Sequence, residues 1–492
     1  MTTRTELGTL ERSGLVQVAA LVPELEYLFR HALVQDAAYS SLLKQDRRIL
    51  HRLAADTLLS LYPERRRELA AVIALHLERA GDTAGAAEYL VIAGEHALER
   101  FANRESLAFF DRAEASFADD DPRIDLRLRA ALGGAKVGWA FGHDRAIERL
   151  ERVLAFGEER GSTKLVGDVY FWIAFLRRMR RETPETSPQL KHAAARSVEM
   201  GAALGDPVAA AFPNAFAGLG MINGGQLRAG SQLLSEALAQ LVDRADPLSS
   251  AILSGMLSMT YARLGDFEAA ERAVAHAERI AERGDPIAAL DAKISRSAML
   301  IERGDIAEGE TLASTCAAGA EELGALACVV AASAMTGMAH LARDDALGAK
   351  VPLERGDELA EVTNMSSFRT LTQGMLGSVR SRLGDVPGGI AAWTFALERA
   401  DATHDVAGEA MARWERARVE ASGERPDYTA ALADVDVTVK LAEEMEARPW
   451  LARALRLRAQ ILRALGRPAD ADDADRRSRA IAAELGLKDF AP

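Results

Sequence analysis

The stretch Tyr261-Ala-Arg-Leu-Gly-Asp-Phe-Glu-Ala-Ala270 decides the fold, because its Leu-Gly-Asp turn returns about every forty residues through most of the chain. Close copies are Leu300-Ile-Glu-Arg-Gly-Asp305 and Ser381-Arg-Leu-Gly-Asp385. Weaker copies lie at Gly142, Gly224, Gly423 and Gly466, and Asp344-Asp345 fills the position between the two close copies. A repeat of this length predicts stacked supersecondary units rather than separate globular domains.

One repeat illustrates the physics of the whole array. Apolar residues at three- and four-residue steps predict a helix over 248–264. Gly265 is expected to end this helix, because glycine adopts the left-handed conformation that helix termini often require, and Asp266 to cap the next helix. The apolar face of that next helix carries Phe267, Ala270, Val274, Ala277 and Ile280. We expect each helix pair to bury its apolar stripe against the next pair along the chain. The prediction is therefore an all-α solenoid.

This unit resembles a tetratricopeptide repeat. The residues that match the repeat are, in order, Tyr261, Gly265, Phe267, Ala270 and Ala277. Val274 departs from the repeat, which usually has an aromatic residue there. We assign residues 103–492 to a tetratricopeptide-like solenoid of some nine or ten helix pairs, and residues 61–102 to a helical linker with a first pair.

Composition excludes several classes of protein. The net charge is −13 and only 5% of the 492 residues are aromatic. An acidic chain lacks the positive surface that general nucleic-acid or anionic-membrane binders need. The amino end lacks a basic stretch followed by an apolar core, and no apolar run reaches about 18 residues, so we expect a cytoplasmic protein with no membrane contact. The two cysteines are expected to be small buried residues; redox or metal roles are the alternative.

Residues 1–60 do not follow the repeat and contain a second pattern, over Tyr27 to Asp56. This pattern resembles the junction in large bacterial STAND-type signalling ATPases, particularly those fused to adenylate or guanylate cyclases or to LuxR-type regulators. The matching residues are Phe29, His31, Leu33, Ala38, Tyr39, Leu42, Leu43, Arg47 or Arg48, Leu50 and His51. The stretches at 74–82 and 87–97 match the next conserved block of that family. The resemblance implies a short winged-helix-like remnant that leads into the repeats.

The resemblance also implies a protein partner, such as an ATPase or a cyclase, because the chain has no Gly-x-x-x-x-Gly-Lys-Ser/Thr loop of its own. In STAND-type ATPases a winged-helix histidine can contact the β-phosphate of bound ADP, and His31 occupies the matching motif. Its role as a sensor of nucleotide state would need a phosphate site on the partner. The alternative is a structural histidine that caps or packs a helix.

Aromatic and basic residues gather in one third of the array and form a candidate ligand or partner surface. The candidate residues are Trp139, Phe171, Trp172, Phe175, Arg177, Arg178 and Arg181. Such neighbours occur in nucleic-acid and acidic-peptide sites. The alternative is a core-facing aromatic stripe followed by a solvated helix end, where positive charge complements the helix dipole.

No motif in the sequence specifies catalysis, a cofactor or a metal. The histidines are scattered, with no His-x-x-x-His or His-Glu-x-x-His spacing. We therefore predict a non-catalytic interaction and regulatory module of a bacterial signalling or transcription-control system, which binds a protein or small effector on the solenoid. The alternatives are a fragment of an ATP-binding or cyclase regulator that is inactive alone, and a DNA-binding transcriptional regulator.

Overall fold

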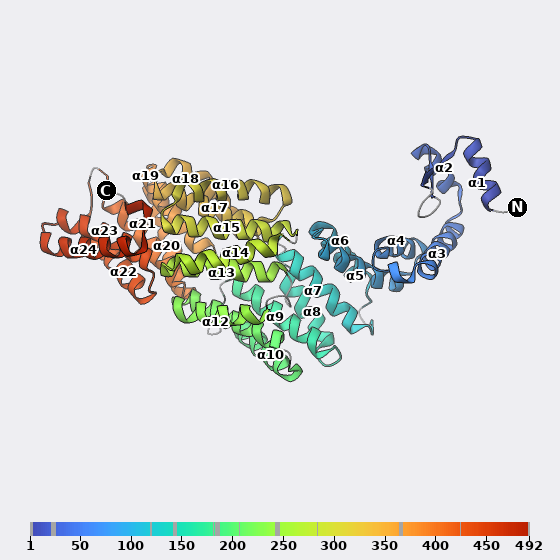
Figure 1. Ribbon diagram of the computed structural model, residues 1–492, viewed down its shortest axis with the longest axis horizontal. Coiled ribbons are helices and arrows are strands. Elements are labelled where there is room, and N and C mark those ends of the chain that lie inside the picture. The colour runs from blue at the N-terminus through green and yellow to red at the C-terminus, as the bar shows by residue number, and fades with distance from the viewer. Residues whose placement is uncertain are drawn as a thin grey trace. The chain divides into compact units, whose positions relative to one another are not determined.

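The computed structural model describes residues 3–20, 26–118, 121–140, 145–180, 182, 187–205, 207–241, 247–282, 284–363, 368–423 and 425–490. These residues form 24 α-helices and one two-stranded sheet (Figure 1). They divide into two compact units. Unit 1 is Met1–His96 with Ala108–Asp121, and unit 2 is Ala97–Leu107 with Pro122–Pro492. None of the described helices is long and apolar enough to cross a membrane.

Unit 1 begins with a helix and a β-hairpin. Strands β1 and β2 pair antiparallel, with Val16 opposite Phe29. The elements are α1 (Thr3–Arg12), β1 (Val16–Ala20), β2 (Glu26–Phe29), α2 (Ala32–Ser41), α3 (Lys44–Leu61), η1 (Pro63–Arg65), α4 (Ala70–Ala80), and parts of α5 (Thr83–Glu99) and α6 (Asn103–Ser116). A small core of Ala55, Ile73, Leu77 and Ala86 joins α3 to α4 and α5. That residues 1–60 are a winged-helix-like remnant stays a prediction.

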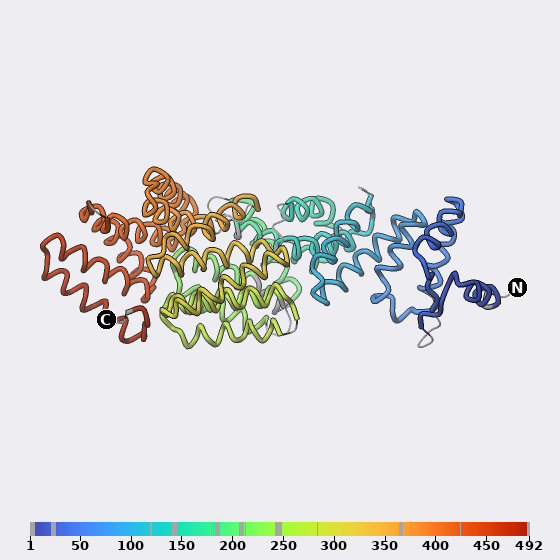
Figure 2. The backbone as a smooth tube through the Cα atoms, turned by 90° about the horizontal axis from the view of Figure 1, so that it is seen from above, coloured from blue at the N-terminus to red at the C-terminus, as the bar shows by residue number. Residues whose placement is uncertain are grey.

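Unit 2 contains nine consecutive helix pairs among the described residues. They are α7 (Ile124–Ala140) with α8 (Ala146–Gly157), α9 (Thr163–Met179) with α10 (Pro188–Leu204), α11 (Pro207–Asn223) with α12 (Leu227–Leu241), α13 (Pro247–Leu264) with α14 (Phe267–Ala281), α15 (Pro286–Arg303) with α16 (Ile306–Leu323), α17 (Leu326–Ala342) with α18 (Ala346–Val362), α19 (Arg369–Arg382) with α20 (Val386–Thr403), α21 (Val406–Glu420) with α22 (Tyr428–Glu444), and α23 (Arg448–Ala464) with α24 (Pro468–Leu485). The short η2 (Lys488–Phe490) comes after the last pair. Figure 2 traces the backbone through these pairs. The predicted all-α, tetratricopeptide-like solenoid is confirmed.

The turn chemistry agrees with the repeat signal. Gly265 has φ +84° and ends α13, and the Asp266 carboxylate accepts a hydrogen bond from the Ala269 N–H at 2.9 Å. Asp344 adopts the same left-handed conformation, with φ +59°, although it is not a glycine. In the copy at Gly224 the left-handed residue is the following one, Gly225. The copy at Gly142 lies outside the described residues.

The array also makes contacts that a nearest-neighbour solenoid does not predict. Helix α13 packs against α23, five pairs further along the chain. Arg228, at the start of α12, forms an ion pair with Glu446 at 2.6 Å, and the backbone at Gly225 approaches Met445 and Val406. Each pair packs against the next, as expected, and in addition the array curls until distant pairs meet. One core cluster therefore contains buried residues from α11 to α23.

Candidate functional site

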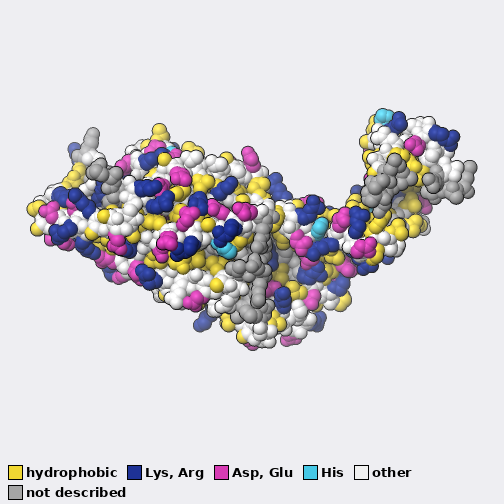
Figure 3. Space-filling model, viewed as in Figure 1, with side chains coloured by type: hydrophobic (Ala, Val, Ile, Leu, Met, Phe, Trp, Pro, Cys, Tyr) yellow, Lys and Arg dark blue, Asp and Glu magenta, His cyan; other side chains and the backbone are white. Residues whose placement is uncertain are grey.

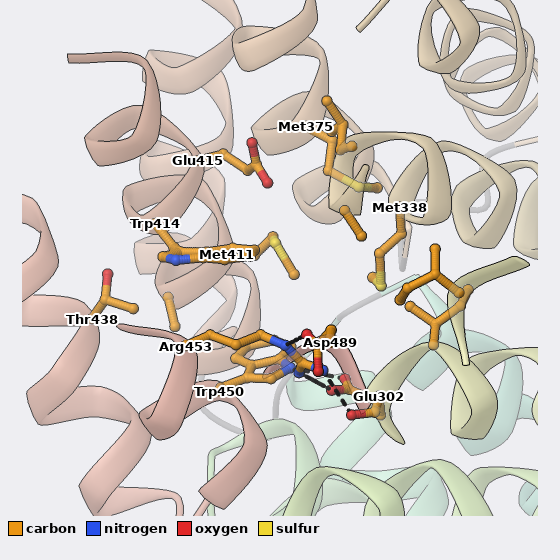
Figure 4. A pocket seen from close by; sticks show the side chains of 15 residues that line it. Glu302, Met338, Met375, Met411, Trp414, Glu415, Thr438, Trp450, Arg453 and Asp489 are labelled. Carbon is orange, nitrogen blue, oxygen red and sulfur yellow. Dashed lines mark hydrogen bonds and ion pairs between the residues drawn. The ribbon is translucent and has the colours of Figure 1, made fainter. Parts of the chain in front are cut away.

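The curl of unit 2 encloses a cavity that the first helices of five successive pairs share (Figure 4). Helices α15, α17, α19, α21 and α23 supply most of the lining. The apolar lining residues are Ile301, Ile306, Met338, Leu341, Ala342, Met375, Ala410, Met411, Trp414 and Trp450. The polar ones are Glu302, Glu415, Thr438, Arg453 and Asp489. We refer to this space as the axial cavity.

Hydrogen bonds from α23 to α15 close one side of the axial cavity. The indole N–H of Trp450 donates to both carboxylate oxygens of Glu302, at 2.8 and 3.0 Å. Arg453 donates to the backbone carbonyl of Glu302 at 2.9 Å and to Asp489 at 2.7 Å. The dashed lines in Figure 4 mark the bonds around Glu302. Because Glu302 and Trp450 are 148 residues apart, these bonds depend on the curvature of the whole array.

Glu415 supplies the buried polar group on the other side of the axial cavity. Its side chain extends from α21 toward Met375 (Figure 4) and the residue is only 1% exposed. Its Oε1 accepts a hydrogen bond from Arg418 at 2.8 Å, whereas its Oε2 has no hydrogen-bond partner among the described residues. An unpaired carboxylate oxygen in an apolar site is costly, since desolvation is only partly compensated. This oxygen is therefore a strong acceptor on a residue that lines the cavity.

Arg418 orients Glu415 from outside the lining. Its guanidinium also donates to the backbone carbonyl of Leu341 at 3.1 Å and to Asp344 at 2.6 Å. Burial lowers the pKa of Arg418, but the nearby carboxylates of Glu415 and Asp344 outweigh this effect and raise the pKa. Arg418 is thus a permanent cation that is shared between two carboxylates.

The charged side chains that line the axial cavity are mostly acidic. Glu302, Glu415 and Asp489 carry carboxylates, and Arg453 is the single guanidinium among the lining residues. Arg263 lies over the ring of Trp450, 5.5 Å from its centre, but does not line the cavity. A cavity with an excess of carboxylates favours a cationic or hydrogen-bond-donating ligand.

Size limits what the axial cavity can hold. Its volume is about 50 Å³. This is enough for a few water molecules or one small functional group, and too little for a folded segment. Met338, Met375 and Met411 are flexible and polarisable, so the walls can adapt to the shape of a guest. The described residues contain no group of three or more His, Cys, Asp or Glu side chains that could hold a metal ion.

The predicted aromatic residues belong to the core of the first two helix pairs of unit 2. Phe171, Trp172 and Phe175 are buried on α9. Phe175 contacts the ring of Trp139 edge-on at 5.6 Å, and Phe216 contacts Phe171 at 5.0 Å. Phe171 and Arg178 also line a second cavity of about 530 Å³, together with residues of α10 and α11 and His404. Two residues of the predicted set, Phe171 and Arg178, therefore line this second cavity.

The predicted cations are engaged in local contacts. Arg177 forms ion pairs with Glu151 and Glu182, and Arg178 donates to the backbone carbonyls of Glu182 and Gly220 at 3.0 and 3.1 Å. Arg181 lies outside the described residues. The surface formed by this set stays a prediction, and the contacts of Arg177 and Arg178 agree with the alternative of a charged helix end.

His31 occupies the N-cap position of α2, where its side chain makes no capping hydrogen bond, and it is exposed. Other residues of the same motif meet in unit 1. Nδ1 of His51 lies 2.8 Å from Nδ1 of His76, and Nε2 of His51 lies 3.0 Å from the Tyr39 hydroxyl. The motif residues Tyr39 and His51 thus connect α2, α3 and α4. The motif is evident in the sequence, but the cluster that Tyr39 and His51 form with His76 is not.

The axial cavity was also missed by sequence reasoning, although a signal was present. Met338, Met375 and Met411 are 37 and 36 residues apart, and Trp414 and Trp450 are 36 apart. Such spacing, close to the repeat length, places the same side-chain type at the same point of successive first helices. Methionine and tryptophan that recur in this way mark the inner face of the array.

The two cysteines are buried thiols. Cys316 lies on α16 and Cys328 on α17, and neither forms a disulfide. Burial raises the pKa of both thiols, so both stay protonated and unreactive near neutral pH. This environment agrees with the expectation of small buried residues.

Comparison with known proteins places this architecture among tetratricopeptide-like helical repeat proteins. No family model and no curated protein matches the chain. Among solved structures, the APC/C hetero-tetramer Cut9–Hcn1 is similar, with 14% identity, 94% of this chain and 93% of that chain covered, and a TM-score of 0.50. A Rap protein complexed with Competence and Sporulation Factor has 13% identity, covers 81% and 98%, and has a TM-score of 0.47. A STAND protein with a tetratricopeptide repeat sensor from Pyrococcus horikoshii has 12% identity, covers 77% and 56%, and has a TM-score of 0.39.

Proposed function

We propose that this chain is a non-catalytic binding protein that captures a side chain of a polypeptide, or a small effector, in the axial cavity. The observation that carries the proposal is the buried Glu415, whose Oε2 has no partner among the described residues and lies beside an apolar cavity. A bound ligand that donates a hydrogen bond to this oxygen would remove the cost of leaving it unpaired.

The geometry favours recognition of an anchor group over enclosure of a whole ligand. A cavity of about 50 Å³ takes one functional group, while the rest of a peptide would lie outside it. Tryptophan and methionine around a few buried polar groups form an anchor pocket, where much of the binding energy of an interface is concentrated. Trp414, Trp450 and Met411 provide such walls.

The second part of the proposal is a protein partner, such as an ATPase or a cyclase, that docks on unit 1. Several large apolar side chains of this unit are exposed, including Leu33 at 82%, Leu43 at 72% and Leu53 at 60%. Apolar surface of this kind is characteristic of interaction sites. The exposed His31 lies two residues before Leu33 on the chain, where it can donate a hydrogen bond to a phosphate group that such a partner holds.

The cavity beside Phe171 and Arg178 is a further candidate contact surface for the same ligand or partner. It is wider than the axial cavity, at about 530 Å³, and is lined mostly by apolar side chains of α9, α10 and α11. On the face of unit 2 shown in Figure 3, acidic and basic side chains are interspersed. Recognition of a partner would thus depend on apolar cavities and not on a surface of uniform charge.

A random-peptide selection on the full chain tests the proposal. The wild type is compared with Met375→Phe, which fills the axial cavity, and with Leu347→Phe, an apolar-to-aromatic change at an exposed position of α18. We expect the wild type and Leu347→Phe to enrich the same peptides, and Met375→Phe to bind them at least about tenfold more weakly. Failure to enrich any peptide above a blank support, or equal binding by Met375→Phe, would contradict the proposal.

A further inference from the structure

The chemistry of Glu415 limits which chemical group of a ligand can bind in the axial cavity. A buried carboxylate is stabilised by a positive charge or by strong N–H donors. Arg418 supplies one donor to Oε1 but divides its charge between Glu415 and Asp344. The remaining oxygen, Oε2, therefore favours a hydrogen-bond donor on the ligand that is itself positively charged.

The rest of the axial cavity distinguishes between possible cations. Its walls are mostly methionine, tryptophan and aliphatic side chains, which suit an alkyl stem. An ammonium group is a compact point charge, whereas a guanidinium is planar and larger. A volume of about 50 Å³ fits the compact group better.

We propose that the axial cavity binds a primary ammonium group on a short alkyl stem, such as a lysine side chain of a bound polypeptide, with Glu415 Oε2 as its acceptor. This inference rests on the proposed function only in its choice of the axial cavity as the binding site. It assigns the chemistry of the anchor, which neither the fold nor the resemblance to known repeats supplies.

Titration of the full chain with three linear probes of similar size tests the inference. The probes are n-butylammonium, n-butanol and n-butyrate, and the readout is tryptophan fluorescence, because Trp414 and Trp450 line the cavity. We expect n-butylammonium to bind with a millimolar Kd, n-butanol at least about tenfold more weakly, and n-butyrate not at all. Equal binding of n-butanol and n-butylammonium would overturn the assignment of a cation.

Variants locate the site. Glu415→Gln keeps the shape of the side chain but removes its charge, and should weaken n-butylammonium at least about tenfold. Glu398→Gln, at an exposed position of α20, should leave the Kd unchanged. Met375→Phe fills the cavity and provides a second test if Glu415→Gln does not fold. An unchanged Kd in a folded Glu415→Gln or Met375→Phe chain would overturn the inference.

The two proposals can fail separately. Peptides that bind the wild type but not Met375→Phe, and whose binding survives Glu415→Gln, would support the proposed function and contradict the ammonium site. Binding of n-butylammonium that Glu415→Gln abolishes, in a chain that enriches no peptide, would support the ammonium site and contradict peptide recognition.

Discussion

The indole N–H of Trp450 donates to the carboxylate of Glu302 at 2.8 Å, across 148 residues of chain. Trp450 lies on α23 and Glu302 on α15, so the bond joins repeats that are four pairs apart. Both residues are buried. The bond stabilises the curved arrangement of the helix pairs, and its two residues line the axial cavity. The binding site therefore depends on packing between distant repeats.

Replacement of Trp450 by Phe should lower the free energy of unfolding by about 1.5–3 kcal/mol, because a buried carboxylate loses a donor. Trp393→Phe is the matched control. The indole of Trp393 is also buried but donates to a neutral backbone carbonyl, that of Gly374, at 3.0 Å, so its loss should cost about 0.5–1.5 kcal/mol. Urea unfolding followed by circular dichroism measures both. Equal losses would show that the charge on Glu302 does not strengthen the bond.

The repeat glycines should differ in their tolerance of a side chain. Gly265 and Gly384 have similar φ angles, +84° and +95°. A Cβ at Gly384 meets no atom within 4 Å, whereas a Cβ at Gly265 would approach Leu485 to 2.9 Å. Gly384→Ala should therefore cost about 1–2 kcal/mol for the left-handed conformation alone, and Gly265→Ala should cost more. Thermal unfolding of the two variants shows which substitution lowers stability more. A smaller loss of stability for Gly265→Ala than for Gly384→Ala would contradict this account.

Asp291 on α15 should make the stability of unit 2 depend on pH. Burial raises its pKa from the usual 3.8 to about 7. The folded chain therefore holds a proton that the unfolded chain releases, and the stability that this group contributes is present below about pH 4 and is lost as the pH rises through about 7. Asp291→Asn should show a smaller fall in Tm between about pH 5 and 8 than the wild type. The control is Asp401→Asn, at an exposed position of α20. An identical pH profile for Asp291→Asn and the wild type would refute the prediction.

The contact between His51 and His76 should make unit 1 sensitive to acid. Burial lowers the pKa of both imidazoles, and the charges of Arg79 and Arg47 lower that of His51 further. The folded unit therefore favours neutral rings. The stability that they contribute is complete above about pH 6.5 and is lost as the pH falls through their folded-state pKa values.

Hydrogen exchange of the α3 and α4 amides tests this expectation. Protection should fall between about pH 7 and 5 in the wild type, beyond the intrinsic dependence of exchange on pH, and should change less in His76→Phe, which cannot take up a proton. His31→Phe, at an exposed histidine in the same unit, is the control and should behave as the wild type. A pH response retained in full by His76→Phe would place the sensor elsewhere.

Local features of the sequence were enough to predict the fold. Apolar periodicity and a Gly-Asp turn act within about one helix pair, so they can be read without knowledge of distant contacts. The turn at Gly265 and the cap at Asp266 lie where they were expected. The environment of the aromatic residues of α9 could not be predicted in the same way, because an apolar stripe has the same periodicity whether it faces a core or a groove.

By itself the sequence determined that helices form, where they end and that they pair in order, since each of these depends on residues a few positions apart. Only the tertiary structure decided which helices meet across the axis. Curvature is the sum of small rotations at every interface between pairs, and each rotation depends on the side chains packed there. For this reason Glu302 could not be matched with Trp450, nor Glu415 placed beside a cavity, before the array was seen to curl.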